Sequence, residues 1–416
     1  MNKTLRLRRV PVAAGRPGRV LVATVFDDAE RGMVRSAAAP LLAGALPGAD
    51  LGGAPPVTAP GAAVGVMFAA SYLDRRGVTA GFALVAHRDD AAGLALAEQA
   101  ASRWLGALRS RRLLIADVAP LCGGGQRALR LMDEAASTAE PLFVLGTPVA
   151  PPGTERPGVV FGAGTDGAGT DGVGTDGVGT DGVPEGGRVF LPAHGAPLAT
   201  KAEAAARGLR ILDGTCPLVA AVQDDAAAYA SRGDAVVVIG RKNDAVVPVL
   251  AAHAGEAAVV VHDTTEAEGL REPDPERVSF VIAPGMPADE AMGILAVLRR
   301  RFSTLRGHHF DVLCDAASDR ALTIASIAGA SELLLVVTGD ANEPLAQDAR
   351  AVAVTGLADL GLDLLAEVTT IGLVRTLSAP AGLDETVLRT LSGLGPLTVS
   401  RRGAYTTQIP EPVPVS

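Results

Sequence analysis

The stretch ILDGTCPLV, residues 211–219, decides how the rest of this chain is interpreted. It joins a short apolar run to a turn that contains Cys216, and Pro217 then occupies a position that favours the first turn of a helix. A thiol at the start of a helix lies near free backbone N–H groups, which favour the thiolate that binds metals. The alternative is that Cys216 is a small buried apolar residue in a turn.

The other two of the chain's three cysteines occur in the same sequence context. Cys122 follows RRLLIADVAPL and precedes GGGQRALRLMDEAA, and Cys314 follows HHFDVL and precedes DAASDRALTIASIAG. The three cysteines are spaced at nearly equal intervals, each about the size of one small α/β unit. Ligands of open α/β sheets bind at the carboxyl ends of the strands. We therefore expect three units whose thiols converge on one point.

Composition excludes several classes of partner. A net charge of −9, with one Trp and three Tyr, argues against a nucleic-acid surface. No apolar run approaches the roughly 18 residues that a membrane span needs, so we expect no membrane partner. A large acidic chain with three cysteines suits the reducing cytoplasm better than a disulfide framework. We therefore expect a cytoplasmic protein.

Apolar runs alternate with helix-like patterns along the chain, which is the sequence form of α/β domains. Residues 164–183 are four copies of G-T-D-G-[A/V], a tract too rich in glycine to offset its ordering entropy, so we expect a flexible insertion over 162–187. The expected divisions are a disordered N-terminus over 1–18, an additional α/β unit over 19–111, three cysteine units over 112–215, 216–312 and 313–405, and a tail over 406–416.

Several kinds of site fit three separated cysteines. Structural zinc usually draws ligands from close pairs such as C-x-x-C, and the sequence contains none. Single thiolates from three distant units suit an iron–sulfur cluster with one iron left open. CGGG at 122–125 is a possible phosphate-binding turn, but it lacks the G-x-G-x-x-G spacing. His194, in PAHG at 192–195, is either a ligand-binding residue after a strand or an ordinary turn histidine.

PAHG, DGTCPLV and a third cysteine followed by a helix with Arg320 resemble the 4-hydroxy-3-methylbut-2-enyl diphosphate reductase (LytB/IspH) family. The resemblance runs from about Arg112 to about Pro410, with the glycine-rich repeat as an insertion. It implies an α/β fold in which three α/β domains form a trefoil around a central iron–sulfur cluster, here with an extra N-terminal α/β unit. By resemblance, one four-iron four-sulfur cluster binds to Cys122, Cys216 and Cys314.

The family's activity is the two-electron reductive dehydroxylation of an allylic diphosphate to isopentenyl and dimethylallyl diphosphate, a step of isoprenoid biosynthesis in the non-mevalonate pathway. The resemblance therefore implies a small anionic substrate and a low-potential electron donor such as ferredoxin or flavodoxin. Two alternatives stay open. The chain is either a divergent paralogue with a rebuilt pocket for another substrate, or a non-catalytic iron–sulfur electron carrier or redox sensor.

The chain departs from the family's motifs around the substrate. The family's N-P-R-G-F-C-A-G is DVAPLCGGG here, and an expected histidine falls near Gly146. The family's G-H-x-x-H-P-E-V, with a diphosphate histidine and a proton-relay glutamate, is GRKNDAVV, which places Asp244 and Val246 there. The proton donor is therefore unassigned. The family's Q-T-T and N-S-S-N are replaced by Ala283, Pro284 and Gly285, and by Asn342, Glu343, Pro344 and Leu345.

Cations lie close to the positions where these neutral donors are lost. His194 and Ser378 remain of the expected diphosphate contacts, Arg241 lies in GRKND, and Arg375 lies three residues before Ser378. Arginine has a planar fork suited to phosphate oxygens. The sequence therefore predicts an anion site made of His194, Ser378, Arg375 and Arg241. The alternative is that the two arginines are ordinary solvated surface charges.

Overall fold

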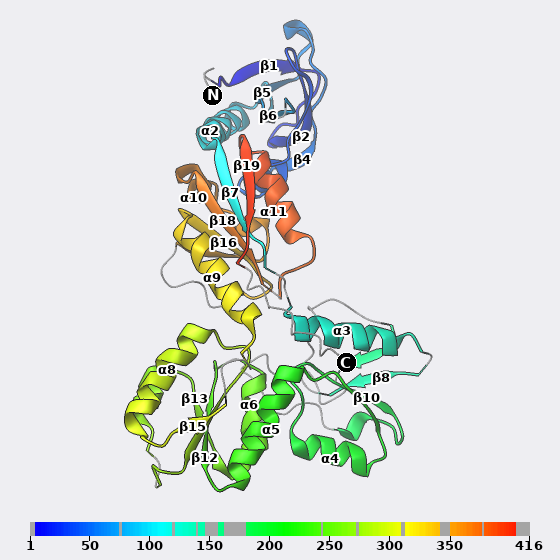
Figure 1. Cartoon of the computed structure of the whole chain (residues 1–416). Coiled ribbons are helices and arrows are strands. Elements are labelled where there is room, and N and C mark those ends of the chain that lie inside the picture. Colours follow the sequence, from blue (N-terminus) through cyan, green and yellow to red (C-terminus); the bar gives the residue numbers. More distant parts are fainter. Residues whose placement is uncertain are drawn as a thin grey trace, which may run out of the picture. The chain divides into compact units, whose positions relative to one another are not determined.

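The computed structural model describes residues 5–74, 77–118, 121–138, 140–145, 157–161, 180–242, 244–271, 274–308, 313–341, 350–376 and 378–404. The chain divides into two compact units, which are described separately (Figure 1). Unit 1 contains Met1–Asp117 and Thr323–Arg402, and unit 2 contains Val118–Leu322 and Gly403–Ser416.

Unit 1 begins with a six-stranded sheet, called here the N-terminal sheet, in the order β1-β5-β6-β3-β2-β4. β1 pairs with β5, β5 with β6, and β2 with both β3 and β6 in antiparallel orientation. This additional unit is therefore a mixed, largely antiparallel sheet with two helices. Its elements are β1 (Arg8–Val12), β2 (Leu21–Asp28), β3 (Gly32–Arg35), α1 (Ala39–Gly44), β4 (Asp50–Gly53), a 3-10 turn (Pro60–Ala62), β5 (Gly65–Leu73), β6 (Thr79–His87) and α2 (Ala91–Ala107).

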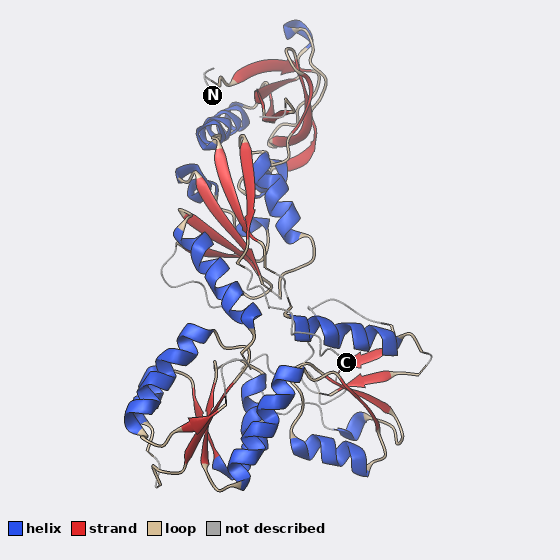
Figure 2. Cartoon of the chain, viewed as in Figure 1, coloured by secondary structure: helices blue, strands red, loops and turns tan. Residues whose placement is uncertain are grey.

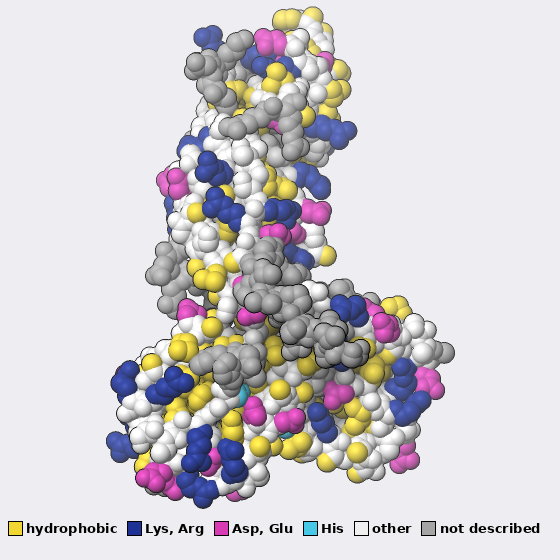
Figure 3. Space-filling view, viewed as in Figure 1, with side chains coloured by type: hydrophobic (Ala, Val, Ile, Leu, Met, Phe, Trp, Pro, Cys, Tyr) yellow, Lys and Arg dark blue, Asp and Glu magenta, His cyan; other side chains and the backbone are white. Residues whose placement is uncertain are grey.

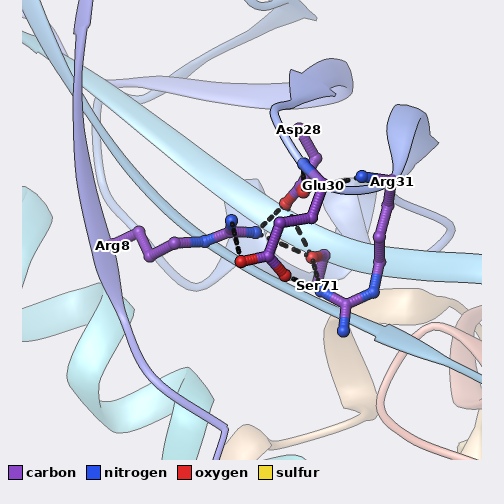
Figure 4. Close-up of polar contacts among 5 residues, drawn as sticks. All are labelled: Arg8, Asp28, Glu30, Arg31 and Ser71. Atoms are coloured by element: carbon purple, nitrogen blue, oxygen red, sulfur yellow. Dashed lines mark hydrogen bonds and ion pairs between the residues drawn. The ribbon is translucent and has the colours of Figure 1, made fainter.

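The prediction that residues 1–18 are disordered is wrong over β1. Val12 is fully buried and Val10 packs against the same apolar cluster, so this strand contributes to the core. Arg8 extends from β1 to Asp28 at the end of β2, and the two form an ion pair (Figure 4). Arg8, a basic residue of the N-terminus, thus has a partner within the fold.

Asp28 is the centre of this polar network and is only 5% exposed. Burial by itself would raise the pKa of this carboxyl. Hydrogen bonds from the Ser71 hydroxyl (2.7 Å) and from the backbone N–H groups of Glu30 (3.0 Å) and Arg31 (3.1 Å), together with the charge of Arg8, lower the pKa instead (Figure 4). The carboxylate therefore stays charged and ties β1, β2 and β5 together.

The second sheet of unit 1 is parallel, in the order β17-β16-β18-β7-β19. Its strands are β7 (Arg111–Ala116), β16 (Leu333–Val337), β17 (Ala351–Val354), β18 (Thr370–Arg375) and β19 (Leu397–Arg402). The helices that follow along the chain are α9 (Asp315–Gly329), a 3-10 turn (Leu357–Asp359), α10 (Leu362–Glu367) and α11 (Leu383–Ser392).

Two sequence predictions are wrong in this sheet. We expected β7 to belong to the first cysteine unit, 112–215, but it pairs with β18 and β19 of the third. Leu113 and Leu114 point to opposite faces and both are buried, which is typical of an inner parallel strand. The sequence PLAQDARAVAVTG, residues 344–356, predicts a helix, but residues 351–354 form β17.

The two sheets of unit 1 share one apolar core. A single cluster of buried residues includes Phe68 and Phe82 of the N-terminal sheet and Leu335 and Leu373 of the parallel sheet. Arg111, 3% exposed, donates hydrogen bonds to the carbonyl oxygens of Ala107 (2.7 Å), Leu365 (2.7 Å) and Leu394 (2.6 Å). The apolar core of the N-terminal sheet is therefore continuous with that of the parallel sheet.

Unit 2 contains two parallel four-stranded sheets with helices on their faces (Figure 2). The first, in the order β11-β10-β8-β9, contains β8 (Leu142–Val144), β9 (Val159–Phe161), β10 (Arg188–Leu191) and β11 (Arg210–Asp213), and the helices of this part are α3 (Gly123–Ala136) and α4 (Leu198–Ala206). The second, in the order β13-β12-β14-β15, contains β12 (Ala235–Ile239), β13 (Ala258–Val261), β14 (Val278–Ile282) and β15 (Arg306–Gly307). Its helices are α5 (Pro217–Ser231), α6 (Val246–Ala254), α7 (Thr264–Gly269) and α8 (Ala288–Arg301), with a 3-10 turn at Gly255–Ala257.

The last copy of the glycine-rich repeat is ordered, whereas residues 162–179 lie outside the described part of the chain. Thr180 begins a 3-10 turn (Thr180–Gly182) and is fully buried. Its hydroxyl donates to Glu203 of α4, and Arg207 donates to the carbonyl oxygens of Thr180 and Val183. The predicted flexible insertion over 162–187 is therefore wrong at its C-terminal end.

In the part of the chain that the structure describes, no helix is both long and apolar enough to cross a bilayer. Figure 3 shows that basic and acidic side chains are interspersed over the faces in view.

Candidate metal centre and anion site

The three cysteines stand at the starts of three helices, as the sequence predicted. Cys122 is the N-cap of α3, Cys216 is the N-cap of α5, and Cys314 directly precedes α9. All three lie in unit 2 and none is in a disulfide. Each helix start provides backbone N–H groups that favour a negatively charged sulfur.

Cys122 and Cys314 are hydrogen-bonded to each other. The Cys314 thiol donates to Cys122, and this bond, with the backbone N–H groups of Gly125 (3.4 Å to Sγ) and Gly124, lowers the pKa of Cys122 to about 6. The same hydrogen bond, followed by burial, raises the pKa of Cys314, since Cys314 holds the shared proton. The pair therefore contains one sulfur that is readily deprotonated near neutral pH.

The Cys216 sulfur lies close to Gly124, which belongs to the first turn of α3, the helix that begins at Cys122. A β-carbon added to Gly124 would lie 2.6 Å from the Cys216 sulfur, so this sulfur sits directly over the first turn of α3. One turn further along α3, Arg127 donates a hydrogen bond to the carbonyl oxygen of Thr215 (3.2 Å). The starts of α3 and α5 are thus in contact, and their cysteines are held on the same side.

The placement and chemistry of the three sulfurs bear on whether they can hold a metal. Among the described residues, no group of three His, Cys, Asp or Glu side chains is already close enough together to hold a metal ion. Two of the three sulfurs are nevertheless in contact, and the third lies against the helix start that carries the first. Thiolate ligands suit soft metals and iron–sulfur clusters. The residues therefore fit such a group.

His194 follows β10 in a tight turn next to the Cys216 segment. Gly195 has a positive φ of 80°, and its N–H donates to the carbonyl oxygen of Pro192 (2.9 Å). Burial lowers the pKa of His194 to about 4, so the imidazole is neutral at physiological pH. A neutral imidazole has one ring N–H to donate and one nitrogen to accept. His194 can therefore bind an anion through a hydrogen bond without adding a charge.

Arg241 is placed after β12 but is already paired. Its Nε donates to Glu290 Oε2 (3.0 Å), and a second guanidinium nitrogen bonds to Glu290 Oε1. The neighbouring Lys242 forms an ion pair with Glu266 (3.5 Å). The charges of both cations are therefore compensated within the surface of the second sheet.

Asp244 lies in the same loop and is an unusual carboxyl. Burial raises its pKa, although the Val246 N–H (2.9 Å) and the charge of Arg241 act in the opposite direction. Its Oδ2 lies 3.0 Å from the position of a β-carbon on Gly285, and the adjacent Pro284 carbonyl accepts a hydrogen bond from the Cys314 N–H (2.9 Å). Sequence analysis identified Asp244 only as a departure from the family motif.

Ser378 and Arg375 belong to unit 1. The Ser378 hydroxyl contacts the hydroxyls of Thr338 (3.0 Å) and Thr376 (2.9 Å) and accepts from the Gly339 N–H (3.1 Å), at the carboxyl ends of β16 and β18. Arg375 donates to the carbonyl oxygen of Ala379 (3.4 Å) and lies 3.8 Å from Asp384.

Thr338 and Thr376 were not predicted as site residues from the sequence. The available signal was that each directly follows an apolar strand. Gly146 and residues 342–345, which carry other departures from the family, lie outside the described residues.

The fold and the site define a class of protein in which parallel α/β sheets present single cysteines from helix starts. The model of the LytB protein family matches residues 113–392, and the chain belongs to this family. The match begins at β7, so the N-terminal sheet lies outside it.

Curated relatives agree with this family. The 4-hydroxy-3-methylbut-2-enyl diphosphate reductase of Gluconobacter oxydans is 28% identical over 71% of this chain and 89% of its own length. That of Aromatoleum aromaticum is 27% identical over 73% of this chain and 97% of its own length. That of Leifsonia xyli is 33% identical, with 51% of this chain and 66% of its own length covered.

One solved structure supports the fold. The E-1-hydroxy-2-methyl-but-2-enyl-4-diphosphate reductase from Plasmodium falciparum matches with a TM-score of 0.59 and 19% identity, over 73% of this chain and 95% of that protein. At this identity the match concerns the fold.

Proposed function

We propose that this protein is a 4-hydroxy-3-methylbut-2-enyl diphosphate reductase that holds one four-iron four-sulfur cluster on Cys122, Cys216 and Cys314. The observation that carries the proposal is the meeting of the three helix starts. The Cys122 and Cys314 thiols are hydrogen-bonded, and the Cys216 sulfur lies against Gly124. Family membership and the names of the curated relatives support the same activity. The arrangement of the parallel sheets as a trefoil around the cluster is part of this proposal, as is a cytoplasmic location.

The overall reaction consumes two electrons and two protons. The allylic C–O bond breaks, the oxygen leaves as water, and the carbon skeleton gains one hydrogen. A four-iron cluster on three thiolates, when bound, supplies single electrons and an open iron for an oxygen ligand. A low-potential carrier such as ferredoxin or flavodoxin would deliver the electrons.

The side chains of this chain would bind the anionic end of the substrate. His194 is neutral and half-buried, so its ring N–H would donate to a phosphate oxygen without an ion pair. Ser378 would donate its hydroxyl and Arg375 its guanidinium, both from unit 1. Arg241 would first have to break its ion pair with Glu290, so we expect it to contribute least to anion binding among these four residues.

A different substrate is the second candidate, and the Asp244 region favours it. A partly buried carboxyl stands where the family has a diphosphate histidine, and a carboxylate repels a diphosphate. A substrate with fewer negative charges, such as an allylic monophosphate, would be repelled less. In that case the same centre would carry out reductive dehydroxylation on another molecule.

Anaerobic reconstitution tests the cluster. We expect a broad absorbance near ~400 nm and about four irons per chain. A Cys216→Ser variant should lose most of that iron, since one of three ligands is removed. Full iron loading of this variant, or tetrahedral zinc in place of iron, would contradict the proposed centre.

Turnover separates the two candidate substrates. The reconstituted protein is incubated with a low-potential chemical reductant and, in parallel, with the allylic diphosphate and the matching monophosphate. Conversion of the diphosphate to isopentenyl and dimethylallyl diphosphate supports the first candidate. Conversion of the monophosphate alone supports the second. A fully loaded protein that converts neither compound contradicts both, and leaves the electron carrier or redox sensor.

A further inference from the structure

Gln223 is a buried amide on a helix face that is otherwise apolar. It lies on α5 and is 3% exposed, and the other buried residues of that helix are Val219, Val222 and Ala226. Burying an amide costs free energy unless it makes a hydrogen bond. The benefit of the amide therefore lies in what it contacts.

The amide contacts the turn that carries His194. Gln223 Nε2 donates to the carbonyl oxygen of His194 (3.4 Å). A β-carbon on Gly195 would overlap this same nitrogen, so the amide fills the space that a side chain would need. The N–H of Cys216, at the start of α5, donates to the carbonyl oxygen of Ala193 (2.8 Å). Helix α5 thus holds two consecutive carbonyl groups of the turn.

These contacts fix the backbone on both sides of His194. The carbonyl of the preceding residue is held by Cys216, and the carbonyl of His194 itself by Gln223. Gly195 completes the turn at a positive φ that L side chains rarely adopt. With the backbone fixed, the direction of the imidazole depends on its side-chain torsions alone. Loss of the amide would leave a part-buried carbonyl unpaired and free the turn to change.

We propose that Gln223 is a positioning residue, which orients His194 so that its ring N–H meets an anionic ligand. This inference rests on the proposed function, because it takes His194 as a contact of the substrate's phosphate groups. Gln223 itself touches only the turn and acts through it. The inference adds to the site a residue from the interior of the helix that carries Cys216.

The first test is calorimetric titration of the cluster-loaded protein with inorganic pyrophosphate. Gln223→Met keeps the length of the side chain and removes the donor, and we expect it to weaken binding about tenfold, the worth of one hydrogen bond. His194→Ala should weaken binding at least as much. Gln99→Met, at an exposed position on α2, is the matched control and should bind as wild type does. Iron content should be equal in all four proteins.

A second variant makes the test independent of how well Gln223→Met folds. In Gln223→Glu the carboxyl can donate to the His194 carbonyl only while it is protonated. Pyrophosphate binding, relative to wild type at the same pH, should therefore be nearly normal at pH 5.5 and clearly weaker at pH 8.5. His194 titrates near pH 4 and keeps its neutral form throughout this range. Iron content is measured at both pH values, because a merely structural role would lower iron content and binding together at pH 8.5, whereas the positioning role lowers binding alone.

The outcomes distinguish the inference from the proposed function. If the wild type binds pyrophosphate and His194→Ala weakens binding but Gln223→Met and Gln223→Glu do not, the positioning role is wrong and the function stands. If Gln223→Met loses iron as well as binding, the residue supports the fold of the centre, and the positioning role is again wrong. If the loaded wild type binds neither pyrophosphate nor the allylic diphosphate, both are wrong.

Discussion

Gly124 and Cys216 lie close together in the proposed centre. A β-carbon on Gly124 would lie 2.6 Å from the Cys216 sulfur, whereas one on the neighbouring Gly123 would meet nothing within 4 Å. We therefore expect Gly124→Ala to lower the iron content of the reconstituted protein several-fold, because the sulfur must move. Gly123→Ala should retain full iron and be slightly more stable, since alanine favours a helix by about 0.5–1 kcal/mol over glycine. Equal iron in the two variants would contradict the contact.

His194 makes the stability of the protein sensitive to acid. Its pKa is about 4 in the folded protein, against 6.5 for an ordinary histidine. The unfolded chain therefore binds a proton first as the pH falls, and the free energy of unfolding decreases between about pH 6.5 and pH 4. The loss is on the order of 2–3 kcal/mol. His194→Gln cannot titrate, so urea denaturation at pH 7 and pH 4.5 should give a smaller difference for the variant. If wild type and variant lost the same stability between pH 7 and pH 4.5, the pKa of His194 would not be lowered, and its imidazole would be in contact with water.

The sequence was informative about residues where the signal is local. Cys122, Cys216 and Cys314 could be placed at helix starts because a strand, a turn and a helix pattern follow one another within a few residues. Gly124 against Cys216, and Gln223 against His194, depend on contacts between distant segments, for which one sequence has no signal. The same is true of Glu290, which compensates the cation that we expected at the anion site.

The 3-10 turn at the end of the repeat, Thr180–Gly182, could not be predicted from the glycine-rich composition. Thr180 is buried and held by Glu203 and Arg207 of the α4 segment, so the end of the repeat contributes to the packed fold. We expect replacement of residues 164–178 by a short Gly-Ser linker to leave the melting temperature unchanged, since loop closure costs grow slowly with length. Extending the replacement through Val183 should lower it by several degrees. A large loss from the shorter replacement would contradict the linker interpretation.

Strands were harder to predict where a short run had an ambiguous pattern. β17 is four residues of alternating Ala and Val that follow a helix-like stretch, so its partner β16 decides its state. β1 is a basic, proline-containing run that pairs with β5 at the edge of the N-terminal sheet. Edge strands tolerate proline because one side of the backbone needs no partner. Both misassignments are cases in which tertiary pairing outweighed local composition.

At the scale of the molecule, the N-terminal sheet and the last parallel sheet depend on each other. They share one apolar cluster, and Arg111 ties three segments together by their carbonyl groups. We expect a chain that lacks residues 1–107 to expose this cluster and to aggregate during expression, although the family match begins only at residue 113. Size-exclusion chromatography checks this. A truncated chain that is monomeric and melts at the wild-type temperature would contradict the shared core.

The position of β7 in the sheet affects how the chain folds during its synthesis. β7 lies between β18 and β19, and both partners are encoded near the end of the chain. On the ribosome, the N-terminal sheet and β7 would emerge early, with an apolar surface that nothing can cover until synthesis is almost complete. Pairings so distant in sequence also form slowly. Holdase chaperones should therefore associate with the nascent N-terminal segment, and the yield of soluble protein should depend on them more than the stability of the finished fold would suggest.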